Sequence, residues 1–513
     1  MFARSISYTL NGIDAEKLCI ECDAKHGTFS FNMVGLPSNS VKESKDRVAA
    51  AIINAGYQFH ARRYTVNLAP ADLKKDDVGL DLPIAIALMA ATKQVRSLKM
   101  EKCAIVGELS LDGEVRPVRG ILPIALAAKR DNLDGIIVPK ENAEEAAMIE
   151  GLAVYPVESL RDTVEFLENS IQIEPCVINT EDIFSNMSHV VDDMFDVKGQ
   201  FHVKRALEVS ASGGHNLLMI GPPGSGKTML ARRLASILPE FSMEESLETT
   251  KIFSVAGLLT GTNKGIITNR QFRSPHHTIS DIALIGGGSY PKPGEVSLAH
   301  NGVLFLDELP EFKKSALEVL RQPLEDGFVT IARATQTLSF PAKFILIASM
   351  NPCPCGYYGS HIEGHSCSCG QQQIIRYRSK VSGPLLDRID LHIEVPQMHY
   401  SDLMAVPNGE KSVDIRKRVN LCRQIQLERF KNESIYCNAQ MSSKLIRKYC
   451  ELDEESKELL RVAMQKKGLS ARAYDRILKV SRTIADLDNS ERIKVQHLSE
   501  AVNYRSLDRK YWD

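Results

Sequence analysis

The sequence predicts an α/β fold in which a parallel-sheet core lies between an N-terminal mixed α/β domain and a C-terminal helical domain. Short β-type runs alternate with helical segments over residues 1–170. The alternation continues over 191–396, and strands that alternate with helices favour a parallel sheet with helices on both faces. From about residue 413 the chain is rich in helix formers with few Gly or Pro, which predicts a helical domain over 397–513.

The individual elements follow from local patterns. In the first domain we expect the strands 64–68, 104–106 and 135–138 and the helices 41–55, 82–92 and 121–130. Residues 171–190 are polar and weakly patterned, so we expect a linker there. In the core we expect the strands 216–220, 302–306 and 344–349. The first of these leads into a Gly-rich turn and a helix, and the other two end in polar residues.

Composition limits the classes of function. A chain of 513 residues is too long for one hydrophobic core. The formal net charge is -1, so any contact with nucleic acid must come from local basic patches. The chain starts without a long apolar run and contains no stretch of about 18 apolar residues, so we expect neither a signal peptide nor a membrane span. The 11 cysteines are then expected to be mostly reduced thiols in the cytosol.

A phosphate-binding loop is the most specific motif. GPPGSGKT matches G-x-x-x-x-G-K-[ST] in full, between an expected strand and an expected helix. Its glycines let backbone N–H groups face phosphates, and the helix N-terminus adds a favourable dipole. Lys227 is expected to reach the β- and γ-phosphates of ATP, and the Thr228 hydroxyl to bind Mg²⁺. The expected nucleotide-binding residues are Gly221, Pro222, Pro223, Gly224, Ser225, Gly226, Lys227, Thr228 and Asp307.

A second motif, VLFLDE at 303–308, is an apolar strand that ends in two carboxylates. Asp307 is expected to hold Mg²⁺ through water, and Glu308 to polarise the attacking water. A Gly-rich turn can match the loop pattern by accident, but a buried strand needs no acidic pair at its end. The two motifs together predict ATP binding and hydrolysis.

Asn351 follows the third apolar strand, which should lie beside the strand that ends at Glu308. Its amide could orient the attacking water or the γ-phosphate. The alternative is a simple Asx turn before Pro352.

Two arginines are further candidates. Arg388, in SGPLLDRID, should follow the last core strand and lie at the opposite edge of the sheet from the phosphate loop. It could then reach the γ-phosphate only of a neighbouring subunit; the alternative is an ordinary salt bridge with Asp387 or Asp390. Arg472 opens a C-terminal helix, where it could touch the phosphates or simply be solvated.

Four cysteines form a C-x-C pair, a gap of eleven residues and a second C-x-C pair. Four thiolates can enclose Zn²⁺ tetrahedrally, although the spacing is tighter than the usual C-x₂-C. The candidate ligands are Cys353, Cys355, Cys367 and Cys369, with His361 and His365 as possible substitutes. The alternative is a loop of free thiols. Because the cluster follows Asn351 directly, a metal there could stiffen that position.

The sequence patterns that suggest DNA contacts are less specific than the motifs of the nucleotide site. Residues 324–343 predict a hairpin with Arg333 near its tip, and Lys292 lies in another loop with Tyr290 alongside. Either cation could contact phosphates, and Tyr290 could stack on a base; the alternative is a solvated loop. Other basic pairs and runs are expected on solvated surfaces, namely Arg376, Arg378 and Lys380, Arg62 and Arg63, and Lys74 and Lys75.

Together these motifs resemble a known family. GPPGSGKT, VLFLDE, SMNPC, GPLLDRID and SARA in that order resemble the AAA+ ATPases related to magnesium-chelatase subunits, in particular the magnesium chelatase-like ComM/YifB competence protein family. FRSPHHTISDIALIGGG at 272–288 and GEVSLAHNGVLFLDELPEF at 295–312 are especially specific. The resemblance implies a hexameric ring, a channel-facing insertion at 272–288, an arginine finger at Arg388 and a second sensor at Arg472.

The first domain resembles the proteolytic domain of Lon proteases, through GELSLDGEVRPVRGILPIALAAKR at 107–130 and the following GIIVPKEN. Lon uses a Ser–Lys pair in which the lysine takes the serine proton. Here Gly79 stands at the serine position, and Leu122, Pro123 and Ile124 occupy the region of the lysine. We therefore expect assembly or substrate binding from this domain, and no proteolysis.

The resemblance implies a cytoplasmic homo-hexameric ATPase that uses ATP and Mg²⁺ to remodel DNA, for example by branch migration of recombining strands. A structural Zn²⁺ is expected from the cysteine cluster alone. A protein-remodelling ATPase is the main alternative, because fold does not fix function. A magnesium chelatase-type subunit, an ATP-dependent protease and a non-hydrolysing scaffold are weaker alternatives.

Overall fold

The computed structural model describes residues 1–73, 75, 78–96, 98–178, 192–259, 265–288, 291–332, 337–359, 366–397, 409–433, 435–467, 469–505 and 507. The chain forms two compact units. Unit 1 comprises Met1–Met187, Met243–Thr268 and Ala332–Phe340, and unit 2 comprises Ser188–Ser242, Asn269–Ile331 and Pro341–Asp513. The domain boundaries expected at 170, 191 and 397 stay a prediction, and much of the expected linker lies outside the described residues.

Unit 1 is built on a seven-stranded mixed sheet with the order β3-β4-β2-β1-β5-β8-β9. Its strands are β1 (Phe2–Asn11), β2 (Asp14–Lys25), β3 (Ser30–Val34), β4 (Arg63–Ala69), β5 (Cys103–Ile105), β8 (Gly135–Pro139) and β9 (Ala153–Val157). β1 and β2 form a long antiparallel hairpin, whereas β1, β5, β8 and β9 pair in parallel. From Leu18 to Ala24 buried side chains alternate with partly exposed ones, the period of a strand with one face on a core.

Helices cover both faces of this sheet. They are α1 (Asn39–Asn54), α2 (Asp81–Ala91), α3 (Ile121–Arg130), α4 (Ala143–Ala147) and α5 (Leu160–Leu167). α9 (Met243–Ala256) packs on α3, and β6 (Glu108–Leu109) and β7 (Val115–Arg116) form a separate small sheet. Ile105 belongs to one hydrophobic core with residues of α1 and α2. Its neighbour Ala104 belongs to a second core with residues of α3 and α4. Since successive residues of a strand face opposite sides, each face carries its own core. The predicted mixed α/β character is confirmed.

Unit 2 contains a five-stranded parallel sheet with the order β11-β14-β17-β10-β18. Its strands are β11 (Phe272–Arg273), β14 (Val303–Leu306), β17 (Ile345–Met350), β10 (Leu217–Ile220) and β18 (Leu391–Glu394). The predicted parallel sheet and the three predicted core strands are confirmed. Shorter strands of this unit are β12 (Gly286–Gly287), β13 (Lys292–Pro293) and β15 (Phe328–Ala332), whereas most of β16 (Thr337–Pro341) belongs to unit 1.

The strand order corrects the predicted place of Arg388. β18 begins shortly after Arg388 and pairs directly with β10, the strand before the phosphate loop. The last core strand, β18, therefore follows Arg388 in the sequence. It lies next to the strand before the phosphate loop, and not at the opposite edge of the sheet from that loop. Arg388 precedes the N-terminal end of a strand, whereas the phosphate loop follows the C-terminal end of the neighbouring one. The two lie at opposite ends of the strands.

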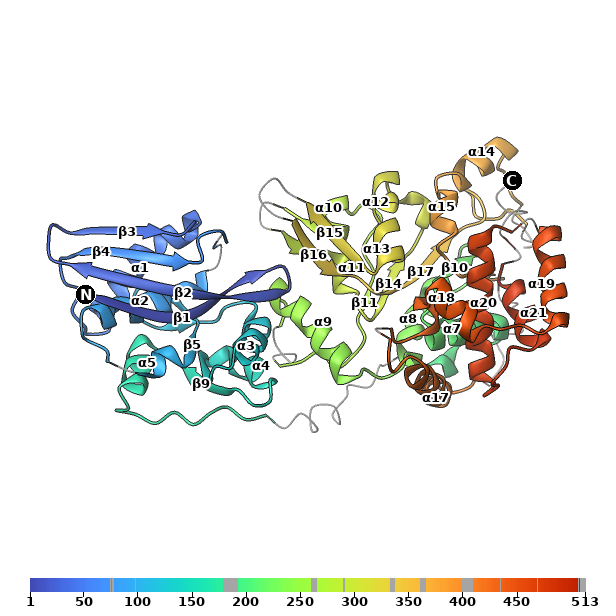
Figure 1. Cartoon of the computed structure of the whole chain (residues 1–513). Helices are drawn as coiled ribbons and strands as arrows, with labels where there is room; N and C mark the ends of the chain where they lie inside the picture. The colour runs from blue at the N-terminus through green and yellow to red at the C-terminus, as the bar shows by residue number, and fades with distance from the viewer. Residues whose placement is uncertain are drawn as a thin grey trace. The chain divides into compact units, whose positions relative to one another are not determined.

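The C-terminal part of unit 2 is helical, as predicted. The helices of the unit are α7 (Phe201–Gly213), α8 (Lys227–Ile237), α10 (Asp281–Ile285), α11 (Glu295–Leu298), α12 (Lys314–Glu318), α13 (Arg321–Asp326), α14 (Gln371–Arg378), α15 (Gly383–Leu386), α17 (Ser412–Arg429), α18 (Ser443–Tyr449), α19 (Glu454–Lys467), α20 (Ala471–Leu487) and α21 (Val495–Asn503). Figure 1 shows α17 and α20 beside α7, and residues of all three share one hydrophobic core with the sheet.

Two basic residues expected on solvated surfaces are buried instead. Lys75 is fully buried, and its ammonium donates to the carbonyl oxygen of Pro70. Arg378 is only 9% exposed, and its Nε donates to the carbonyl oxygen of Pro352 at 3.2 Å. The hydrogen bonds to these backbone carbonyls offset part of the free-energy cost of removing the two cations from water.

Among the described residues, the structure contains no helix that is both long and apolar enough to cross a membrane.

Candidate active site

The phosphate loop connects β10 to α8, and its glycines are required by geometry. Gly224 and Gly226 have φ of 75° and 88°, in the left-handed region that glycine adopts without strain. At Gly221 a Cβ atom would lie 2.2 Å from the carbonyl oxygen of Val395, so no larger residue fits there. Lys227 is the first residue of α8, which aims the N-terminus of that helix into the loop.

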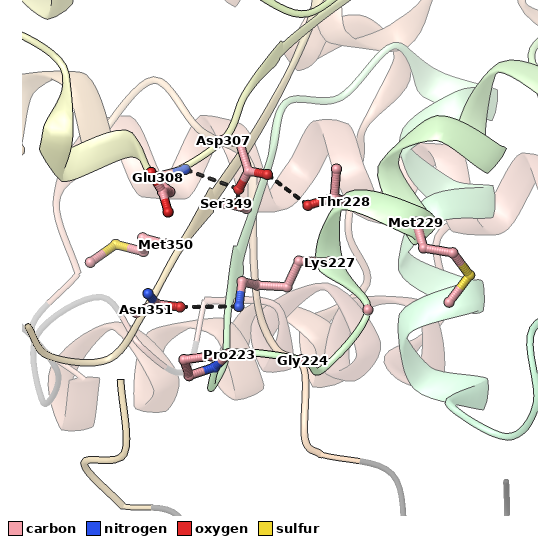
Figure 2. Close-up of a pocket in the computed structure, with 11 residues that line it drawn as sticks. Pro223, Gly224, Lys227, Thr228, Met229, Asp307, Glu308, Ser349, Met350 and Asn351 are labelled. Carbon is pink, nitrogen blue, oxygen red and sulfur yellow. Dashed lines mark hydrogen bonds between the residues drawn. The ribbon is translucent and has the colours of Figure 1, made fainter. Parts of the chain in front are cut away.

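A pocket of about 430 Å³ opens at this loop. Figure 2 shows side chains from the loop, from the end of β14 and from the end of β17 converging on it. It is lined by Pro223, Gly224, Gly226, Lys227, Thr228, Met229, Asp307, Glu308, Ser349, Met350 and Asn351. The pairing of β14 with β17 brings Asp307 and Asn351 to the same end of the sheet, as the sequence predicts.

Lys227 is the cation of the pocket and is only 9% exposed. Its ammonium donates to the carbonyl oxygens of Gly221 at 2.8 Å and Pro222 at 2.9 Å, and to Asn351 Oδ1 at 3.2 Å. Burial lowers the pKa of Lys227 from its ordinary value, and the Asp307 and Glu308 carboxylates oppose that shift. The side chain is thus directed into the pocket and beside Asn351.

Asp307 and Thr228 form the oxygen-rich side of the pocket. The Thr228 hydroxyl donates to Asp307 Oδ2 at 2.6 Å, while the Ser349 hydroxyl and the Glu308 N–H, at 3.0 Å, donate to Asp307 Oδ1 (Figure 2). A hydroxyl beside a carboxylate is a donor set that Mg²⁺ accepts, together with phosphate oxygens and water. Ser349 lines the site although the sequence analysis did not select it; its signal is its place two residues before Asn351.

Glu308 has an unusual backbone conformation, with φ of 53°. Its side chain is 57% exposed, and its Oε2 lies 3.6 Å from Nδ1 of His277. His277 stacks on His276 with ring centroids 4.1 Å apart, in the segment 272–288 that the resemblance singles out. No sequence spacing relates His277 to the acidic pair, so its contact with Glu308 could not be predicted from the sequence.

Arg388 and Arg472 are not among the residues that line the pocket. Arg388 forms an ion pair with Glu325 and donates to the carbonyl oxygen of Pro384 at 2.8 Å. That ion pair lowers the pKa of Glu325, and Arg472 and Arg476 add to the effect. The alternative interpretation of Arg388, a salt bridge with Asp387 or Asp390, is wrong in its partner, because Arg388 pairs with Glu325. Asp390 instead meets Arg476, with Oδ1 2.6 Å from Nη1.

The four cysteines lie together in a single cluster. Their Sγ atoms are all within 4.8 Å of one another, and Cys353 is fully buried. Cys353 Sγ lies 3.3 Å from that of Cys355 and 3.8 Å from that of Cys367. Such a set of four sulfur ligands suits Zn²⁺. The alternative ligands His361 and His365 lie outside the described residues.

The remaining candidates are only partly described. Lys292 is exposed on β13, which pairs with β12. Arg333 and Tyr290 lie outside the described residues, although β15 and β16 flank Arg333 as the hairpin prediction requires. In unit 1, a Cβ at Gly79 would lie 3.3 Å from Cγ1 of Val106 and of Val118, and Leu122 is fully buried in α3.

Family models match most of the chain. The model described as magnesium chelatase, subunit ChlI, matches residues 193–403. The subunit ChlI C-terminal model matches residues 409–505, and a further model of subunit ChlI of Mg-chelatase matches residues 20–142.

Individual relatives agree with these models. The chain is 44% identical over 501 residues to competence protein ComM of Haemophilus influenzae, which covers 97% of this chain and 96% of that protein. It is 44% identical over 499 residues to the uncharacterized protein YifB of Escherichia coli, with the same shares covered. It is also 27% identical over 190 residues to a Lon protease of Aster yellows witches'-broom phytoplasma, covering 36% of this chain and 22% of that protein.

Proposed function

The chain belongs to the magnesium chelatase-like AAA+ family that includes ComM and YifB, and we propose that it is a hexameric ATPase which couples ATP hydrolysis to the remodelling of DNA. The convergence of Lys227, Thr228, Asp307, Glu308 and Asn351 on one pocket carries the ATPase part of the proposal. A relative named as a competence protein favours DNA as the substrate, with branch migration of recombining strands in the cytoplasm as the expected activity.

In the proposed reaction, the loop N–H groups and Lys227 bind the β- and γ-phosphates of ATP. Mg²⁺ would be held by Thr228 and, through water, by Asp307, where it would neutralise charge on the phosphates. Glu308 takes up a proton from the attacking water, and Asn351 orients that water or the γ-phosphate.

The second cation of the reaction comes from a neighbouring subunit in this proposal. A phosphoryl transition state spreads charge over three oxygens, and Lys227 covers one side only. Arg388 lies at the opposite end of the strands from the phosphate loop of its own chain, so it can serve only another chain's nucleotide. Arg472 would act from the helical domain, and Lys292 and Arg333 would contact DNA in the channel.

The experiment that tests the substrate compares ATPase rates without DNA and with single-stranded, duplex and branched DNA. We expect branched DNA to stimulate hydrolysis most. Stimulation by unfolded protein and by no form of DNA would instead support a protein remodeller, and dependence on a chelatase partner subunit would support a chelatase-type role.

We also propose that the four cysteines bind one Zn²⁺. Protein purified without chelators should contain close to one zinc per chain, because four sulfur donors already lie within 4.8 Å of one another. The variant with Cys353→Ser and Cys367→Ser should lose that zinc. Elemental analysis that finds no metal would refute this part.

A further inference from the structure

We infer that the metal in the four-cysteine cluster controls the nucleotide pocket, because it closes the loop that positions Asn351 beside Lys227. This inference rests on the proposed ATPase function and on the proposed zinc. In this inference the cluster supports catalysis by fixing the position of Asn351, in addition to stabilising the loop locally.

The cluster has the dimensions of a tetrahedral thiolate site. Sulfur atoms around Zn²⁺ at a Zn–S distance of about 2.3 Å are about 3.8 Å apart. The Sγ separations are 3.3 Å for Cys353–Cys355, 3.8 Å for Cys353–Cys367 and 3.6 Å for Cys355–Cys367. Metal binding therefore needs only small movements of these side chains.

The first end of the loop touches the nucleotide pocket. Cys353 follows the dipeptide Asn351–Pro352, and Asn351 Oδ1 accepts a hydrogen bond from Lys227. Gly356, between the two halves of the cluster, packs on the phosphate loop so closely that a Cβ there would lie 2.5 Å from Cδ of Pro223. A shift of this end would therefore displace Asn351.

The second end of the loop returns to the same dipeptide. Cys369 is followed by α14, whose last turn carries Tyr377 and Arg378. Arg378 Nε donates to the carbonyl oxygen of Pro352 at 3.2 Å. Burial raises the pKa of Tyr377, and the backbone of Asn351 opposes that shift. Both ends of the cysteine loop thus hold Asn351.

A small internal network joins these two ends. The Arg378 guanidinium lies over the Tyr358 ring, 5.1 Å from its centroid, and the Tyr358 N–H donates to Cys353 Sγ at 3.3 Å. A metal that joins Cys353 and Cys355 to Cys367 and Cys369 fixes both ends relative to each other. Without it, α14 and Asn351 can move apart from Lys227.

Misplacing a group that orients the reactants costs about 10- to 100-fold in rate. We therefore expect removal of zinc to lower kcat by about 10-fold or more. The affinity for nucleotide should change less, because Lys227, Thr228 and the loop N–H groups belong to elements outside the cysteine loop.

The test measures zinc content, kcat and nucleotide affinity for full-length protein before and after removal of the metal, and again after zinc is added back. The same comparison is made with Asn351→Ala. Cys176→Ser is the matched control, since Cys176 is a half-buried thiol outside the cluster. Cooperative thermal unfolding of the metal-free protein establishes that it remains folded.

We expect metal removal to lower kcat reversibly in the wild type and in Cys176→Ser, but to have little further effect in Asn351→Ala, because the metal acts through Asn351. Full activity of folded metal-free protein would overturn the inference, as would an equal fold-loss in Asn351→Ala or a protein that binds no zinc. Absence of any ATPase activity in zinc-loaded protein would instead refute the proposed function.

Discussion

Glu325 holds the side chain of Arg388 in an ion pair within the same chain. Arg388 is thereby only 12% exposed, while Glu325 remains largely accessible. If Arg388 serves the nucleotide of a neighbouring subunit, its guanidinium must leave the Glu325 carboxylate during ring assembly and bind the γ-phosphate of that nucleotide instead. The ion pair and the proposed arginine finger are therefore two states of one side chain.

This relationship predicts that two inactive variants complement each other. Lys227→Ala lacks the cation of the phosphate loop and Arg388→Ala lacks the cation supplied in trans, so mixed rings contain some interfaces with both groups intact. ATPase assays on the mixture should show activity that neither variant shows alone, and wild-type specific activity should rise with protein concentration. The exposed Arg376 provides a control, since Arg376→Ala should be active without a partner. Inactive mixtures, or activity per chain independent of concentration, would refute the trans-acting role.

Glu308→Gln and Lys227→Ala should separate binding from hydrolysis. The glutamine cannot take up the proton of the attacking water, so hydrolysis should fall at least about 100-fold while ATP still binds. Lys227→Ala should lose binding itself, because it removes the buried ammonium of the pocket. Titration with a fluorescent ATP analogue beside a steady-state ATPase assay measures both quantities. Equal losses of affinity in the two variants would contradict the assigned roles.

Unit 1 should have no peptidase activity despite its resemblance to Lon. Proton transfer from a serine needs a nearby base, and the matching positions hold Gly79 and the buried Leu122. Casein and an unfolded protein should survive incubation with the protein, ATP and Mg²⁺, as judged by gel electrophoresis. Cleavage that co-purifies with the chain and persists in Glu308→Gln would show that another residue acts as nucleophile.

The buried ion pair of Asp390 and Arg476 should support the fold of unit 2 in a pH-dependent way. Burial alone would raise the pKa of Asp390, but Arg476 and His215 hold it below its ordinary value. The carboxylate therefore stabilises the fold fully above the unfolded pKa of about 3.9, and this contribution is lost as the pH falls through the lower folded pKa.

Asp390→Asn should cost about 3–5 kcal/mol at pH 7, since Arg476 would remain buried without its counter-charge. Urea unfolding at pH 7, 5 and 3.5 measures the free energy of unfolding. The difference in this free energy between wild type and variant should become smaller only at pH 3.5. Glu458→Gln is the control: its ion pair with Arg461 is solvent-exposed, so it should change stability little. A constant difference at all three pH values would contradict the assignment.

Much of the nucleotide pocket could be predicted from sequence because its parts are local motifs. The loop 221–228 and the pair Asp307–Glu308 each combine an apolar strand with polar residues at its end, and parallel strands bring such ends together. The same argument predicted that the strand before Asn351 lies beside the strand that ends at Glu308, and the pairing of β14 with β17 confirms it.

Long-range pairings could not be predicted in this way. Nothing local shows that β18 pairs with β10, which is why the expected position of Arg388 was wrong. The partner Glu325, the contact between His277 and Glu308 and the burial of Arg378 all join segments distant in sequence. The long hairpin of β1 and β2 also escaped prediction, because its alternating polar residues resemble an exposed segment.

The left-handed backbone at Glu308 has a consequence for how this protein can evolve. Such a conformation costs about 1–2 kcal/mol for a residue with a side chain, and in exchange the strand end turns so that two adjacent carboxylates serve one pocket. Asn and Gly adopt that conformation more readily. Glu308→Gly or Glu308→Asn should therefore melt at a higher temperature than the wild type and be inactive. Selection for thermal stability alone would replace Glu308. Its presence therefore reflects a trade-off in which the protein has lower stability and retains ATPase activity.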